Sequence, residues 1–200
     1  MRVMLGSGLA DRAIAETRKL GHVKPNRSVQ TCVVKRRDKP CLRLIVPDMT
    51  SKCRFHLRPA RADEFDFVAE IYIAAMRPLM QQLDAWDEPM RRAAIRRSYK
   101  AADSRIISRD GADIGWIQVT ERDADYNLAQ IQILEEYCGL GIGSEIINAL
   151  LDRAADEGKT VSLSAVRVNR AIGLYQRMGF RVIDPEASPI IDMVWTPASQ

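Results

Sequence analysis

The spacing of apolar positions changes along the chain, and each change predicts an element. Apolar residues recur every three or four positions over residues 65–75, which predicts a helix capped by Asp63 and ended by Pro78. The same spacing predicts a second helix over residues 88–99, with Pro89 in the first turn, where proline is tolerated. The first half of the molecule is therefore expected to present a helical pair.

Alternation with a period of two predicts strands around these helices. A short strand at residues 55–58 is stopped by Pro59, and residues 104–108 and 113–121 form a hairpin whose turn contains Gly111. Further strands are predicted at 128–134, 161–168, 180–183 and 190–195, with helices at 141–157 and 169–178 and a stop at Gly158.

The same alternation assigns residues to the two faces of each strand. One face of the strand at 113–121 carries Ile114, Trp116, Gln118 and Thr120, and the other carries Gly115, Ile117 and Val119. In the strand at 128–134, Ala129, Ile131 and Ile133 are expected on one face, and Leu128, Gln130, Gln132 and Leu134 on the other.

A glycine-rich turn follows the strand at 128–134. Gly139, Gly141 and Gly143 lie at every second position, directly before the apolar stripe of the next helix. Glycine lets the backbone turn sharply, so successive N–H groups can point at one ligand. The helix adds its unpaired first N–H groups and the positive end of its dipole, so the pattern predicts a phosphate-binding turn.

Two widespread phosphate-binding motifs do not fit this turn. The ATP-binding loop requires Lys-Ser or Lys-Thr after its last glycine, whereas Gly143 is followed by Ser144-Glu145. The dinucleotide fingerprint spaces its glycines G-x-G-x-x-G near the start of a βαβ unit. Here the spacing is G-x-G-x-G, and the turn lies two-thirds of the way along the chain.

A second motif downstream of the turn identifies a family. It consists of Asn169, Ala171, Leu174, Tyr175, Gly179 and Phe180. Together with the glycine turn it resembles the GNAT superfamily of N-acetyltransferases, over roughly residues 55–195. The resemblance implies an α/β (α+β) fold: a mixed, mostly antiparallel sheet of six to seven strands, flanked by about four helices. The fourth and fifth strands of that sheet splay apart to form a cleft.

The resemblance also implies acetyl-CoA as co-substrate and places it. The diphosphate is expected on the turn, which comprises Cys138, Gly139, Leu140, Gly141, Ile142, Gly143 and Ser144. Main-chain groups of Ile131 and Ile133 are expected to pair with the pantetheine amides, opposite Asn169. The family usually has Gln or Arg where this chain has Cys138, and Arg167, Arg170 or Lys159 could replace that charge near the phosphates.

The catalytic expectations concern Tyr175 and Glu121. By resemblance, Tyr175 is the general acid that protonates the departing thiolate, and a main-chain N–H near Ile133 stabilises the oxyanion. The general base is left open between Glu121, acting through water, and a water chain alone, because the nearby Gln130 and Gln132 cannot take a proton.

The acceptor is an unidentified amine of a small molecule or a protein. In this family the helical pair forms one wall of the acceptor pocket, so several residues are candidates to contact the acceptor. For the four on the helical pair, Met76, Met80, Trp86 and Met90, plain packing between the two helices is favoured over contact with the acceptor. The candidates are Met76, Met80, Trp86, Trp116 and Gln132, with Met90 beside them.

Composition divides the chain into two parts. Residues 1–55 hold 13 Lys and Arg against 4 acidic residues, whereas residues 56–200 hold 17 against 22. Residues 1–53 are interpreted as a basic, poorly structured extension and residues 54–200 as the acetyltransferase domain. Met49 suggests that the upstream segment comes from an over-extended reading frame. The basic run at residues 35–39 has no interleaved aromatic residue, so nucleic-acid binding is disfavoured.

The remaining expectations are largely negative. Cys32, Cys41, Cys53 and Cys138 lack the spacing of a zinc site, so no metal is expected. No run of eighteen apolar residues and no secretory signal are present, which favours the cytoplasm. A homodimer through the last strand is possible. A non-catalytic acyl-CoA-binding member of the same fold is the alternative function.

Overall fold

The structure is a computed structural model that describes residues 55–183 and 188–198. The expectations for the N-terminal extension, for Met49 and for Cys32, Cys41 and Cys53 lie outside these residues. The described strands form one sheet in the order β1-β2-β3-β4-β5-β7-β6. They are β1 (His56–Pro59), β2 (Ser104–Arg109), β3 (Ala112–Glu121), β4 (Asp125–Ile133), β5 (Thr160–Val166), β6 (Arg181–Val182) and β7 (Ile190–Trp195).

Four α-helices lie among the described residues. They are α2 (Phe65–Gln81), α3 (Glu88–Ser98), α4 (Ile142–Asp156) and α5 (Ala171–Arg177), and three short 3₁₀ turns, η1 (Ala62–Glu64), η2 (Ala101–Asp103) and η3 (Glu135–Tyr137), connect them to the sheet. The mixed sheet and its flanking helices confirm the expected fold class.

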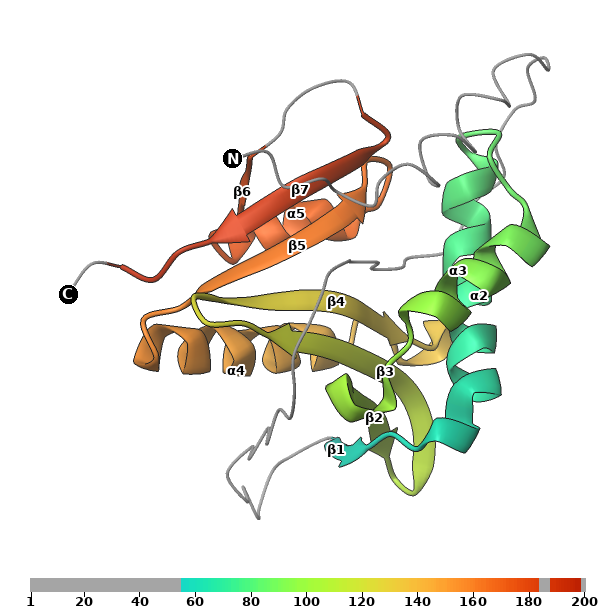
Figure 1. The fold of residues 1–200 in the computed structure, drawn as a ribbon, viewed down its shortest axis with the longest axis horizontal. Coiled ribbons are helices and arrows are strands. Elements are labelled where there is room, and N and C mark those ends of the chain that lie inside the picture. The colour runs from blue at the N-terminus through green and yellow to red at the C-terminus, as the bar shows by residue number, and fades with distance from the viewer. Residues whose placement is uncertain (1–54, 184–187, 199–200) are drawn as a thin grey trace.

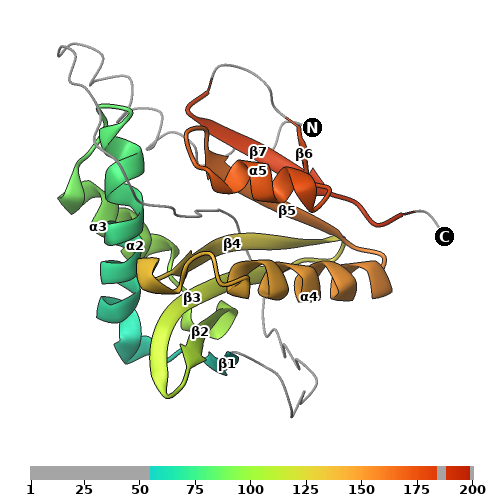
Figure 2. The same cartoon turned by 180° about the vertical axis from the view of Figure 1, so that it is seen from behind.

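The helices cover opposite faces of the sheet. Figure 2 shows α4 and α5 lying on one face, while α2 and α3 lie together beside β2 to β4 (Figures 1 and 2). Two buried clusters correspond to these faces. One joins Ile131 and Leu163 to the apolar stripe of α4, and the other joins Ile106 and Trp116 to α2. The sheet thus separates two cores.

The sheet changes character between β4 and β5. All other neighbouring strands are antiparallel, but β4 and β5 are parallel and pair only over Asp125–Asn127 against Thr160–Ser162. Beyond these three residue pairs the two strands separate (Figure 1). This confirms the splay that the family resemblance implied, and it leaves one edge of β4 without a neighbouring strand.

Two bulges alter the faces predicted from simple alternation. The β2–β3 register shifts at Ile107/Ser108, where Ile114 is the extra residue, and Ile114 joins the α4 side of the sheet instead of the side of Trp116. The β3–β4 register shifts at Gln118/Val119, where Ala129 is extra, so Leu128 shares a core with Ile131. A bulge adds one residue to one strand and thereby reverses the alternation beyond it.

Helix α2 extends beyond the predicted end. Pro78 lies inside the helix, which continues to Gln81. Proline lacks an N–H and so removes one intrahelical hydrogen bond, but it lies only three residues before the last residue of the helix. Burial of the next two apolar side chains, Leu79 and Met80, favours continuing the helix.

The other predicted ends are close to those observed. Asp87 accepts a hydrogen bond from Met90 N (2.8 Å) and caps α3. In the β2–β3 turn Asp110 and Gly111 both have positive φ, as a two-residue turn of this handedness requires. Gly158, with φ of 63°, follows the end of α4 as predicted.

Candidate active site

The free edge of β4 faces the opening between β4 and β5. Leu134 N donates to Ile114 O at 2.8 Å, directly beyond the last residue of β4. Main-chain groups alternate in direction along a strand, so Leu134, Gln132 and Gln130 bond towards β3. The N–H and C=O groups of Ile131 and Ile133 therefore point towards the opening, as the pantetheine-binding expectation requires.

The glycine turn follows η3 and leads into α4. Gly139 and Gly141 have φ of 76° and 85°, a conformation that residues with a Cβ rarely adopt. Gly143 is different, since it lies within α4, where a Cβ would approach Ile133 Cδ1 to 3.6 Å. The first hydrogen bond of the helix runs from Glu145 N to Gly141 O (3.0 Å). The N–H groups before Glu145 thus precede the helical ladder.

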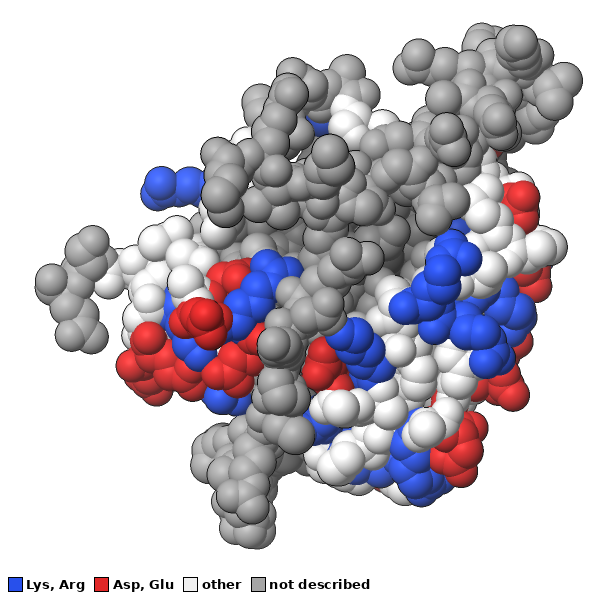
Figure 3. Space-filling model, viewed as in Figure 1, with Lys and Arg blue, Asp and Glu red and all other residues white. Residues whose placement is uncertain are grey.

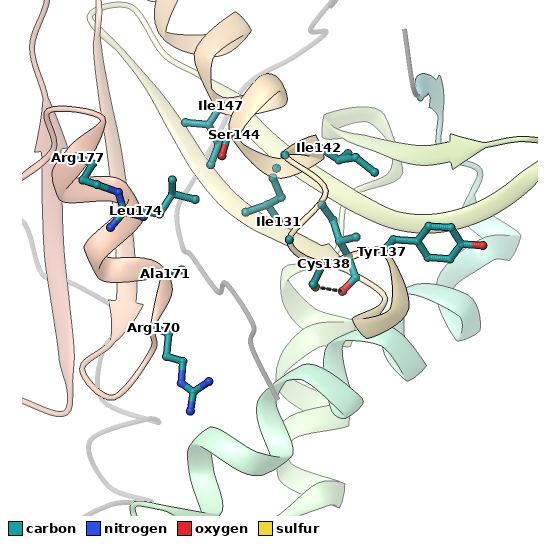
Figure 4. Close-up of a pocket in the computed structure, with 14 residues that line it drawn as sticks. Ile131, Tyr137, Cys138, Ile142, Ser144, Ile147, Arg170, Ala171, Leu174 and Arg177 are labelled. Carbon is teal, nitrogen blue, oxygen red and sulfur yellow. Dashed lines mark hydrogen bonds between the residues drawn. The ribbon is translucent and has the colours of Figure 1, made fainter. Parts of the chain in front are cut away.

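A cavity of about 340 Å³ lies between this turn and α5. Figure 4 shows Ser144, Ile142 and Cys138 on the side of α4 and the turn, with Leu174 and two arginines on the side of α5. The cavity brings together most of the predicted acetyl-CoA residues: Ile131, Ile133, Cys138, Gly139, Gly141, Ile142, Gly143, Ser144 and Arg170. Leu140 is 40% exposed at the tip of the turn and does not line the cavity.

The structure adds lining residues that the sequence did not single out: Tyr137, Ile147, Ala171, Leu174 and Arg177. Arg170, Leu174 and Arg177 lie four and three residues apart, which places them on one helical face. This spacing in the sequence could have identified Arg177 as a residue on the same side of the helix as Arg170.

The two arginines carry the positive charge of the cavity. Within the described chain, neither Arg170 nor Arg177 forms an ion pair. Lys159, proposed for the same task, lies elsewhere: its Nζ is 2.6 Å from Glu121 and 2.9 Å from Glu157, at the closed end of the β4–β5 ladder. Arg167 Nε donates to Ser188 O at 2.8 Å, and Arg167 does not line the cavity.

Cys138 occupies the position where the turn leaves the sheet. Its thiol lies 3.6 Å from Ile133 O and 3.5 Å from Leu134 O, and it donates to both carbonyls (Figure 4 draws one contact). Burial raises the pKa of the Cys138 thiol, and the nearby carboxylates of Glu135 and Glu136 raise it further. The thiol is therefore uncharged at neutral pH and adds no charge to the cavity.

Asn169 and Tyr175 flank the cavity without lining it. Asn169 Oδ1 accepts from Ala171 N (2.9 Å) at the start of α5, while its buried Nδ2 has no hydrogen-bond partner in the structure. An unpaired buried donor is costly unless a ligand satisfies it. Tyr175 is fully buried, with its ring 5.8 Å from that of Phe180.

The structure places Glu121 far from the glycine turn. Glu121 lies opposite Tyr126 at the start of β4, and Ile133 lies seven residues farther along. At about 3.3 Å per residue this is roughly 23 Å. Its carboxylate is held by Lys159 (2.6 Å) and Arg153 (3.5 Å). Glu121 is therefore paired with two cations at the end of β4 that lies away from the glycine turn.

The acceptor candidates divide into two groups. Met76 and Met80 are buried in the core of α2, and Trp86 packs against that core, with the Arg77 guanidinium 5.1 Å from its ring. Trp116 and Gln132 are cross-strand partners on the α2 side of the sheet, and both are buried. The indole Nε1 of Trp116 has no hydrogen-bond partner in the described structure.

No cluster of metal-ligating side chains occurs within residues 55–183 and 188–198. None of the helices described is both long enough and apolar enough to cross a bilayer.

Part of the chain matches one family model. Residues 101–182 match the model of the acetyltransferase (GNAT) domain. No curated protein matches the chain significantly. Among solved structures, PaiA N-acetyltransferase from Thermoplasma acidophilum, in complex with coenzyme A, is 16% identical, with 71% of this chain and 98% of that chain covered and a TM-score of 0.58.

Two further structures give similar values. The ribosomal-protein-S18-alanine N-acetyltransferase from Escherichia coli is 16% identical, with 73% of this chain and 96% of that chain covered and a TM-score of 0.55. Arabidopsis thaliana Naa50, in complex with the bisubstrate analogue CoA-Ac-MVNAL, is 17% identical, with 72% and 99% covered and a TM-score of 0.51. At these identities the likeness is one of fold.

Proposed function

We propose that the chain is a GNAT acetyltransferase and that it transfers the acetyl group of acetyl-CoA to an amine by direct attack of the amine on the thioester. One observation supports this more than any other. The cavity joins the free edge of β4, the glycine turn and two cationic side chains in a single space. These are the features needed to hold an extended amide-bearing arm that ends in a diphosphate.

The donors suit the diphosphate in both charge and direction. The main-chain N–H groups of Ile142, Gly143 and Ser144 lie in the first turn of α4, where the helix dipole favours an anion. Arg170 and Arg177 approach from α5 with guanidinium groups that can each form two hydrogen bonds to a phosphate.

The pantetheine arm has its own partners on β4 and at Asn169. Main-chain groups of Ile131 and Ile133 can pair with the two amides as an added strand would. The buried Nδ2 of Asn169 supplies a donor that no described residue satisfies. Acetyl-CoA supplies the activated acyl group.

The remaining groups stabilise or neutralise the negative charges that form during the reaction. A main-chain N–H of the free β4 edge stabilises the oxyanion that forms at the thioester carbonyl. The Tyr175 hydroxyl donates a proton to the departing thiolate. Glu121 is not assigned a role, because it is paired with two cations at the other end of the strand.

Two measurements test the proposal. Release of free thiol from acetyl-CoA, followed with a panel of primary amines and a peptide with a free amino terminus, reports transfer. Calorimetry reports binding of acetyl-CoA. We expect Arg170→Ala and Arg177→Ala each to weaken acetyl-CoA binding roughly 5- to 50-fold, as loss of a charge-assisted contact does. Arg97→Ala, an exposed arginine of α3, should leave binding unchanged.

The outcomes distinguish an acetyltransferase from a non-catalytic domain that binds acyl-CoA. Thiol release that depends on the amine supports the transferase. Binding of acetyl-CoA without transfer to any amine would instead indicate a domain that binds acyl-CoA without catalysis. No binding by the wild-type protein would contradict both.

A further inference from the structure

The side of the sheet opposite the cavity carries a second set of polar groups at the β4–β5 opening. On β5, Val161, Leu163 and Ala165 belong to the α4 core, so Ser162, Ser164 and Val166 face the other way. Val166 packs in the α2 core, which confirms that direction. The same alternation directs Asp192 of β7 to this face, because Ile191 and Met193 lie in the α4 core.

Ser164 and Asp192 form a hydrogen-bonded pair there. They are cross-strand partners, and Ser164 Oγ donates to Asp192 Oδ1 at 2.5 Å. Ser164 is the one described hydrogen-bond partner of this carboxylate, and no described cation pairs with it. Both residues are partly exposed. The second oxygen, Oδ2, therefore remains available to an incoming donor.

The opposite rim of the opening is polar and uncharged. Counting along the parallel strands from the last pair, Asn127 and Ser162, and allowing for the bulge at Ala129, places Gln130 at about the level of Ser164. Gln130 accepts from Gln132 Nε2 at 2.8 Å, and both amides are buried. On this face, therefore, the β5 rim of the opening carries Ser164, with the Asp192 carboxylate behind it on β7, and the β4 rim carries the amide pair.

Asp125 provides a comparison for Asp192, because both are aspartates that accept a hydrogen bond from a serine of β5. Asp125 lies on the same face at the closed end of the ladder, where Arg122 (3.1 Å) and a hydrogen bond from Ser162 (2.8 Å) satisfy it. Asp192 also accepts a hydrogen bond from a serine, Ser164, but no described arginine forms an ion pair with it. Arg181 of β6 faces the same side opposite Val194, yet it forms no ion pair with Asp192.

We propose that Asp192, oriented by Ser164, is the subsite that binds the ammonium group of the acceptor, so that the substrates are amines positively charged in solution. This rests on the proposed acetyl transfer. Helices α4 and α5 cover the face from which acetyl-CoA enters, so the nucleophile approaches from the face of Asp192. The carboxylate binds the cation there and holds it at the opening until it loses its proton to water and attacks.

The test compares a charged and an uncharged acceptor at neutral pH. Phenylethylamine is a cation under these conditions, whereas aniline is not. We expect Asp192→Asn to raise the KM for phenylethylamine roughly 10- to 100-fold, the range for loss of a hydrogen bond to a charged group, with a smaller effect on kcat. The KM for aniline should stay within about twofold. Ser164→Ala should raise the KM for phenylethylamine less, and Asp192→Glu should recover part of the loss.

Two controls identify a merely structural effect. Asp152→Asn removes an exposed carboxylate of α4 and should change neither KM. Acetyl-CoA binding, measured by calorimetry, should be the same in wild type and Asp192→Asn. Equal losses for both amines, or weakened acetyl-CoA binding, would show that Asp192 only supports the fold and would overturn the subsite.

The remaining outcomes distinguish the subsite from the transferase itself. If the wild type acetylated aniline but not phenylethylamine, the proposed subsite would be contradicted and the proposed acetyl transfer would stand. An unchanged KM for phenylethylamine in Asp192→Asn would have the same consequence. Transfer to no amine at all, despite bound acetyl-CoA, removes both proposals.

Discussion

Cys138 determines how the phosphate end of the cavity is charged. A thiol that donates to two main-chain carbonyls closes the turn against β4, but because its pKa is raised it stays neutral. The positive charge comes instead from Arg170 and Arg177 on the opposite wall. In the proposed site, Arg170 and Arg177 take the place of the charge that the family resemblance puts on the turn.

Restoring a cation on the turn should strengthen binding. Cys138→Arg places a guanidinium beside the N–H groups of α4, so we expect acetyl-CoA affinity to rise roughly 3- to 10-fold in low salt and less in high salt. Cys138→Ser serves as the control, since it keeps the size and a donor but adds no charge. Calorimetry at two salt concentrations measures both. An unchanged affinity would mean that the position lies away from the diphosphate.

Tyr175 is predicted to act on turnover more than on binding. Tyr175→Phe removes only the hydroxyl and keeps the ring packed on Phe180, so folding should be preserved. Coenzyme A thiolate is a fairly good leaving group, so we expect kcat to fall roughly 10- to 100-fold, the lower part of the range for general acid catalysis. Acetyl-CoA affinity should change less than threefold.

Steady-state kinetics and calorimetry together test this prediction. Tyr99→Phe is the matched control, because that hydroxyl donates to Arg61 O (2.9 Å) on the other side of the sheet. Parallel losses in kcat and affinity would show that the Tyr175 hydroxyl anchors the ligand and does not transfer a proton.

At the scale of elements, the sequence predicted features that depend on local chemistry. The glycine turn, the helix that follows it and the two-residue turn at Asp110 and Gly111 are determined by residues within a few positions of each other. The family motif then supplied the splay of β4 from β5. Most of the residues that line the cavity could therefore be predicted from the sequence.

Features that depend on distant residues were missed. The bulges at Ile114 and Ala129 arise from pairing between strands, so strict alternation assigned Ile114 and Leu128 to the wrong faces. Glu121 was the last residue of a correctly predicted strand, but only the tertiary structure shows Lys159 beside it. Asp192 was not singled out for the same reason, because its partner Ser164 lies on another strand.

A substitution at Gly115 tests how closely β3 and β4 approach each other. A Cβ at this position would lie 2.3 Å from Gln132 O, which is main chain and cannot move without disturbing the ladder. We expect Gly115→Ala to lower the free energy of unfolding by about 1–3 kcal/mol, the usual cost of overpacking. Urea denaturation measures it.

Gly173→Ala is the contrasting substitution. Gly173 lies inside α5, where an added Cβ would have Arg177 Nη1, the end of a flexible side chain, as its nearest neighbour at 3.5 Å. Alanine favours a helix over glycine by up to about 1 kcal/mol, so this variant should be more stable than wild type. Destabilisation of both variants alike would show that crowding at Gly115 is not the cause.

For the whole molecule, charge is distributed unevenly over the described surface. Figure 3 shows basic side chains gathered over α2 and α3, and mixed acidic and basic side chains at the far end, where β3, β4 and α4 meet. At that far end, Glu157 accepts from Tyr126 Oη (2.5 Å), Arg153 Nε (2.8 Å) and Lys159. Arg153 and Lys159 also lie 5.1 Å and 4.8 Å from the centre of the Tyr126 ring. This cluster ties the end of α4 to the closed end of the ladder.

The cluster predicts loss of stability in acid. Burial favours the neutral form of Glu157, but hydrogen bonds from Tyr126, Lys159 and Arg153 outweigh it and lower its pKa to about 2. The unfolded value is about 4.3. A lowered pKa contributes stability above the unfolded value, and that contribution is lost as pH falls from about 5 towards 2.

Thermal unfolding between pH 7 and pH 3 measures this contribution. We expect the melting temperature of the wild type to fall over this range and that of Glu157→Gln to start lower and fall less. Asp156→Asn, a change in an exposed neighbour, should follow the wild type. Identical pH profiles for Glu157→Gln and wild type would exclude Glu157 as the source.

Because β4 and β5 pair over only three residues, a ligand bound between them is expected to raise the stability of the folded protein. Three residue pairs join the two parts of the sheet, and the amides of a pantetheine arm lying along the free β4 edge would supply hydrogen bonds that the strands themselves do not make. Binding and folding are then linked, since any ligand of the native state raises its stability. In the proposed reaction, acetyl-CoA binding would therefore stabilise the joint between the two parts of the sheet, and product release would remove that stabilisation.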